Sequence, residues 1–78
     1  MEVQGRVASQ PAVNRNEILF QLEISDGRML PCRAAETYEG NVPVQGAVVM
    51  LEGDVLRDLE TGLDSYDFFF TRLSDVAA

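Results

Sequence analysis

Apolar and polar residues alternate along much of this chain, as they do in β-strands that bury one face and expose the other. The clearest alternation covers residues 17–24, where Ile18, Phe20, Leu22 and Ile24 share one face. Similar patterns predict four more strands, at about residues 2–9, 29–33, 49–55 and 66–73. Because helical periodicity is nearly absent, the sequence predicts an all-β fold.

The turn between the second and third predicted strands decides how they pair. A three-residue loop over residues 25–27 places Leu22 opposite Leu30 and Phe20 opposite Cys32, which keeps the buried face apolar. A two-residue loop would instead place a proline and an arginine opposite the same core residues. The sequence therefore predicts the three-residue loop, with a bulge at Gly27.

The remaining connections complete a barrel. Residues 35–38 are expected to form one helical turn between the third and fourth strands, and residues 57–65 an acidic loop. Gly53, inside the fourth strand, predicts a bulge or a sharp bend. Five short strands with one helical turn in this position match the Greek-key OB barrel. We expect an OB-fold domain at residues 1–73 and a flexible C-terminal tail at residues 74–78.

The charge of the chain restricts its partners. Thirteen acidic residues oppose six arginines, with no lysine, for a formal net charge of −7. Residues 40–78 carry −5 of it, so the positive charge lies mainly in the first half. A strongly acidic surface usually keeps a small domain soluble, and any nucleic-acid partner has to approach against it.

Catalytic and metal chemistry are not expected. The chain lacks histidine, the commonest general base and metal ligand, and shows no nucleophile with a base or phosphate-cradling glycine loop. The acidic residues near the C-terminus do not have the spacing of a calcium loop. Cys32, the single cysteine, is interpreted as a small buried hydrophobe. We therefore expect a protein that is not an enzyme and binds no metal or other cofactor.

The expected location is the cytoplasm. A single cysteine excludes an internal disulfide, which favours an intracellular protein. No basic segment followed by an apolar run, and no apolar stretch of about 20 residues, indicates export or a membrane span.

Several short motifs resemble the OB-fold single-stranded DNA-binding family. Gly5-Arg6-Val7, Pro11 and Phe20-Gln21-Leu22-Glu23 are similar to the start of bacterial single-stranded DNA-binding proteins and of primosomal replication protein N (PriB). Cys32 after a hairpin, Gly46-x-x-Val49-x-Leu51-x-Gly53-x-Val55 and Gly62-Leu63 continue the resemblance over residues 3–73. A partial likeness to bacterial initiation factor one, another small OB barrel, ranks lower because that factor is usually basic. The resemblance implies a role in DNA replication and binding of single-stranded DNA or RNA on the outer face of the second and third strands.

That chemistry needs cations for phosphates and exposed aromatic rings for bases. The candidate binding residues are Arg6, Arg15, Leu19, Gln21, Arg28, Arg33, Tyr38 and Phe69. Arg33 ranks first because the predicted register turns it outward beside Leu19 and Gln21, where a guanidinium can stack on a base or contact a phosphate.

A different class of function stays open. The acidic surface suits a protein-protein interaction module that does not bind nucleic acid, and clustering of arginines or of acids on the second and third strands would distinguish the two. Phe68 and Phe70 share one face of their strand, so Phe69 points outward. It is expected to contact either a base or the second copy of a homodimer.

Overall fold

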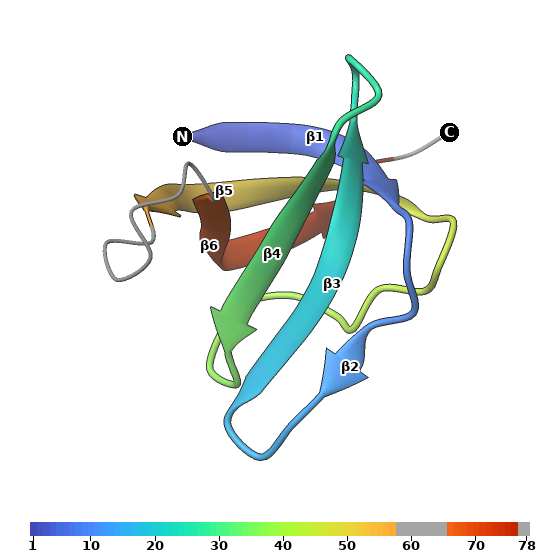
Figure 1. The fold of residues 1–78 in the computed structure, drawn as a ribbon. Coiled ribbons are helices and arrows are strands. Elements are labelled where there is room, and N and C mark those ends of the chain that lie inside the picture. Colours follow the sequence, from blue (N-terminus) through green and yellow to red (C-terminus); the bar gives the residue numbers. More distant parts are fainter. Residues whose placement is uncertain (58–65, 77–78) are drawn as a thin grey trace.

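The computed structural model describes residues 1–57 and 66–76 of the chain. Its strands are β1 (Glu2–Val7), β2 (Ala12–Val13), β3 (Glu17–Ile24), β4 (Met29–Ala35), β5 (Val48–Arg57) and β6 (Tyr66–Asp75). They curl around one another into a single sheet that surrounds the core, as Figure 1 shows.

The sheet closes into a five-stranded barrel. Neighbouring strands follow the order β1, β5, β6, β4, β3, and β3 returns to β1 through the pair Val7 and Leu22. All pairings are antiparallel except that of β4 with β6, where Cys32 lies opposite Phe68 and Arg33 opposite Phe69. The very short β2 continues the path of β1 along β3, so β1 and β2 together count as one barrel strand. This Greek-key order is that of the OB barrel, which confirms the predicted fold class.

The predicted register of the β3–β4 hairpin is confirmed. Leu22 lies opposite Leu30 and Phe20 opposite Cys32. The amide of Ile24 donates to the carbonyl of Arg28, which closes a three-residue loop over residues 25–27. Gly27 has a φ of 86°, a left-handed conformation that glycine adopts without steric cost. The same register places Arg33 beside Leu19 on the outer face.

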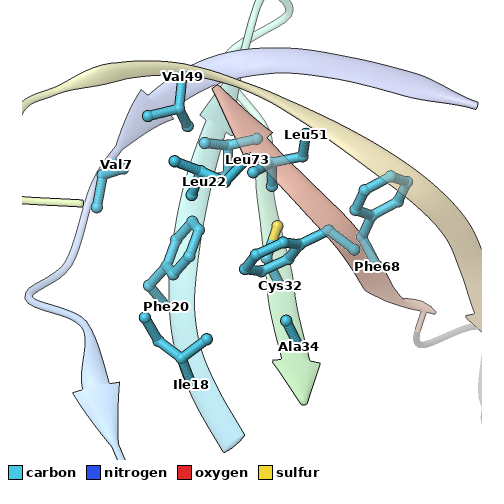
Figure 2. Close-up of a cluster of buried hydrophobic side chains, with 11 residues drawn as sticks. Val7, Ile18, Phe20, Leu22, Cys32, Ala34, Val49, Leu51, Phe68 and Leu73 are labelled. Atoms are coloured by element: carbon cyan, nitrogen blue, oxygen red, sulfur yellow. The ribbon is translucent and has the colours of Figure 1, made fainter. Parts of the chain in front are cut away.

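One apolar core fills the barrel, and Figure 2 shows its side chains pointing inward from all five barrel strands. Phe68 and Phe70 of β6 are fully buried, and the rings of Phe70 and Phe20 lie 5.6 Å apart in a tilted arrangement. Cys32 is buried, as expected. Leu30 and Ile24, predicted to be buried, are only partly so, because they lie beside the hairpin loop, where β3 ends and β4 begins.

A bulge lets β5 and β6 bend around the core. Glu52 lies opposite Arg72 and Gly53 opposite Phe70, so Thr71 is an extra residue on β6. A Cβ at Gly53 would lie 2.0 Å from the carbonyl oxygen of Phe69, which explains why only glycine fits here. The extra residue also shifts the inward positions of β6, so that Leu73 joins the core after Phe70. The predicted irregularity at Gly53 is confirmed.

The connection after β4 differs from the prediction. The helical turn expected at residues 35–38 is wrong: residues 36–37 form a tight turn in which the amide of Tyr38 donates to the carbonyl of Ala35. A helix is not needed here, because Tyr38 packs edge-on against Phe70, 5.2 Å between ring centroids, and Pro43 is buried. Two side chains of an irregular segment thus pack against the core where a helical turn was expected.

The ends of two strands also differ. The first strand ends at Val7 instead of residue 9, and β2 follows where only a turn was expected. β6 continues through Asp75, opposite Val49, and so extends two residues into the segment expected to be a tail. The predicted acidic loop at residues 57–65 lies outside the described residues apart from Arg57, which ends β5.

Candidate functional site

An interruption between β1 and β2 shapes the outer face of β3. Val7 lies opposite Leu22 and Ala12 opposite Leu19. The chain therefore advances five residues from Val7 to Ala12, whereas β3 advances only three over the same distance. The two extra residues make segment 8–11 arch away from β3. The Ser9 hydroxyl replaces a strand carbonyl there, accepting a hydrogen bond of 2.9 Å from the amide of Gln21.

This arch leaves an open hollow of about 230 Å³, here called the β3–β4 hollow. Its floor is formed by outward residues of the two strands, paired as Leu19 with Arg33 and Gln21 with Pro31. Ser9, Gln10 and Ala12 line its other side. Of the described residues that line it, one is an arginine and none is acidic. The hollow therefore combines apolar walls, amide groups and one positive charge.

Arg33 is the central residue of the outer face. It is half-buried, less exposed than predicted, and its Nε atom is buried. It also takes part in a further interaction within the chain, so a ligand would have to join or displace that interaction. Across the parallel pairing its neighbour is Phe69 of β6. Phe69 points outward, as predicted, and is half-buried. A guanidinium and an aromatic ring are thus neighbours on the barrel surface.

Tyr38 and Phe69 line a second open hollow of about 320 Å³, here called the Tyr38–Phe69 hollow. It lies where β4 and β6 stop pairing, between Ala35 and Thr71, and Phe70 of the core also lines it. The Tyr38 hydroxyl donates a hydrogen bond of 2.9 Å to the carbonyl of Asn41. Burial raises the pKa of Tyr38 above its ordinary value. Its ring is therefore a fixed wall of the hollow and not a freely exposed stacking platform.

The other predicted arginines are not brought to these hollows. Arg6 pairs with Glu23 at 3.1 Å on the part of β3 nearer the hairpin. Arg28 forms an ion pair with Asp26 in the hairpin loop. The pKa of the Asp26 carboxyl is lowered, and the largest cause is the hydrogen bond that the backbone amide of Arg28 donates to it. Arg15 precedes β3 and lies at the opposite end of that strand from Arg28, about 25 Å away along an eight-residue strand. Of the predicted cations, Arg33 alone lines either hollow among the described residues.

Seven lining residues outside the buried core were not among the predicted site residues: Ser9, Gln10, Ala12, Pro31, Ala35, Thr37 and Thr71. Small or polar side chains in a surface segment carry little signal. Only the arch of segment 8–11 brings the first three over β3, and that arch depends on a strand interruption that alternation does not reveal.

Within residues 1–57 and 66–76, no three histidine, cysteine or acidic side chains come together as a possible metal site. The same residues contain no apolar helix of membrane-spanning length.

No protein-family model, curated protein or solved structure matches the chain.

Proposed function

We propose that this chain is a non-catalytic OB-fold module that binds single-stranded nucleic acid weakly on the outer face of β3 and β4. It would act in the cytoplasm, in the manner of the single-stranded DNA-binding and primosomal proteins that its sequence resembles. OB barrels bind oligonucleotides on this face, although a shared fold alone does not carry the function.

The observation that supports the proposal is the composition of the β3–β4 hollow. The two hypotheses from the sequence differ in whether arginines or acids occupy this face. The described lining holds Arg33 and no acid, while Glu17 and Glu23 lie toward opposite ends of β3. A negative ligand would therefore meet a positive charge here, with Phe69 and Leu19 beside that charge for contact with bases.

The proposed binding is weak because few charges contribute. Arg6 and Arg28 already neutralise acids, and Arg15 lies at the end of the strand. One or two phosphate contacts predict a slope of log affinity against log salt of about −0.7 to −1.4. With a net charge of −7 opposing approach, we expect a dissociation constant no better than about micromolar at physiological salt.

The test is an anisotropy titration of labelled oligo-dT at about 20 and 150 mM salt, with a duplex of the same length for comparison. We expect saturable binding to the single strand, weaker binding to the duplex, and about a fourfold loss between the two salts if one phosphate is contacted. Arg33→Gln should weaken binding about tenfold at low salt, because a charge-assisted contact is lost.

Arg28→Gln is the matched control, since it removes the same charge from an arginine held by Asp26 in the hairpin loop. It should bind like the unmodified chain. Absence of binding at about 20 mM salt, where the Debye length is about 20 Å, would reject the proposal. The acidic protein-contact module would then be the better hypothesis.

A further inference from the structure

The two hollows open on the same outer face, one on each side of Arg33. Outward residues of β4 follow one another as Pro31, Arg33 and Ala35. Pro31 and Arg33 line the β3–β4 hollow, whereas Ala35 lines the Tyr38–Phe69 hollow. Phe69, the neighbour of Arg33 on β6, belongs to the second hollow. A positive charge therefore separates two hollows with largely apolar walls.

Each hollow suits one flat ring. Pockets for drug-sized ligands occupy about 300–1,000 Å³ and enclose most of the ligand. These two hollows have about 230 and 320 Å³, one below and one just above the lower limit of that range, and both are open to solvent. A ring in the first hollow would contact Leu19 and Gln21, and a ring in the second would contact Phe69 and Tyr38.

The spacing across the strands limits how two rings can be joined. Leu19, Arg33 and Phe69 occupy one row on three neighbouring strands, which lie about 4.8 Å apart. Rings beside Leu19 and Phe69 would thus be separated by about 10 Å, whereas stacked bases are about 3.4 Å apart. Two bases can occupy both hollows only when they are unstacked, with their linking phosphate over Arg33.

One acidic residue continues this row on the β5 side, and another lies in the neighbouring row of β3 and β4. Asp54 lies opposite Phe69 on β5, and Glu17 lies opposite Ala35 on β3. A further phosphate beyond either position would meet a carboxylate within about two strand spacings, a repulsion that is only partly screened at that distance.

From these observations we propose that the unit recognised is one unstacked dinucleotide step, with a base in each hollow and the internucleotide phosphate on Arg33. This inference rests on the proposed function and deepens it by fixing the length of the ligand. It also explains a preference for single strands, because bases in a duplex stay stacked.

The test is a length series of dT1, dT2, dT3 and dT6, and the same lengths of oligo-U, followed by amide chemical shifts of the 8.6 kDa chain. We expect affinity to rise about tenfold from one to two nucleotides and less than threefold for each nucleotide after that. The shifts caused by dT2 should include residues of both hollows. The oligo-U arm decides between DNA and RNA as the preferred strand.

Two filling variants separate the hollows. Ala12→Leu adds bulk at the β3–β4 hollow and Ala35→Leu at the Tyr38–Phe69 hollow, and both positions are outside the core. Each should abolish the gain from dT1 to dT2 while the melting temperature stays close to that of the unmodified chain. Val13→Leu, which adds bulk at an exposed position that lines neither hollow, is the control and should keep the gain.

The outcomes distinguish the two proposals. Binding of dT6 that depends on Arg33 but rises evenly with length, or that neither filling variant affects, would overturn the dinucleotide unit and leave the proposed function in place. If no oligonucleotide of any length shifts the spectrum, both proposals fail.

Discussion

Tyr38 contributes to the core and to the surface at the same time. One side of its ring packs against Phe70, its hydroxyl donates to the carbonyl of Asn41, and it also lines a surface hollow. This explains how an irregular connection can cover the barrel core. It also means that a substitution at this residue changes the core and the hollow together.

Tyr38→Phe should separate the two contributions. At pH 7 we expect the free energy of unfolding to fall by about 0.5–1 kcal/mol, because one hydrogen bond is lost while the exposed Asn41 carbonyl can bind water. Urea denaturation would measure this difference. A loss of several kcal/mol would contradict it and show that the hydroxyl has a structural role beyond this bond.

The raised pKa of Tyr38 also predicts a dependence on pH. Burial favours the neutral phenol, so the unfolded chain, with the ordinary pKa of 10.0, loses this proton at a lower pH than the folded chain does. The stabilisation is therefore complete below about pH 10 and is lost as the pH rises through the folded-state value. In urea titrations from pH 8 to 11, Tyr38→Phe should lose less stability than the unmodified chain. Parallel curves would contradict this.

At the scale of elements, the contact between Gly53 and β6 sets the curvature of the barrel. The backbone of β6 approaches so closely that an alanine Cβ would lie 2.0 Å from the Phe69 carbonyl oxygen and 2.6 Å from the Phe70 Cα. We expect Gly53→Ala to reduce the free energy of unfolding by at least about 2 kcal/mol, since either the bulge or the strand pairing has to shift. Glu52→Ala, at the exposed neighbouring position, is the control and should change it by about 0.5 kcal/mol or less. Equal urea midpoints for the two variants would show that the bulge adapts freely.

Elements differ in how far the sequence could predict them. The β3–β4 register followed from residue alternation and turn chemistry, because a one-residue slip would bury Arg33 and Pro31. The irregularity at Gly53 followed from a glycine inside a strand. Neither rule applies to segment 8–11, whose arch depends on the Ser9 hydroxyl bonding to a residue of β3 twelve positions away.

The candidate site shows the same division. The outward directions of Leu19, Gln21, Arg33 and Phe69 were predictable from period two. The place of Phe69 beside Arg33, in one row with Leu19, was not predictable, because it depends on the parallel pairing of β4 with β6. Ion pairs also escape such a pattern, so Arg6 and Arg28 remained candidates until Glu23 and Asp26 were found beside them. The two-residue alternation along a strand indicates which way a side chain points. Its partners come from other strands, which meet it only in the folded barrel.

At the scale of the whole molecule, size and charge act in opposite directions on self-association. A domain of 78 residues buries only about 60% of its extended-chain surface, so a second copy would add stability, and the outward Phe69 is the expected contact. Two chains that each carry −7 repel one another, and salt screens this repulsion. Salt should therefore strengthen a homodimer. It should weaken the proposed nucleic-acid binding, because the release of counterions contributes less free energy at higher salt.

The resulting prediction is a competition for Phe69. In sedimentation equilibrium at high protein concentration, we expect more dimer at about 300 mM than at about 20 mM salt, and Phe69→Ser should restore the monomer at both. Oligo-dT added at low salt should dissociate any dimer, because a base in the Tyr38–Phe69 hollow and a second copy would cover the same ring. A monomer at every concentration and salt would reject the dimer, and Phe69 would then remain assigned to the ligand alone. A dimer that oligo-dT leaves intact would place the subunit contact elsewhere on the barrel, because a dimer through Phe69 has to release that ring before a base can occupy the hollow.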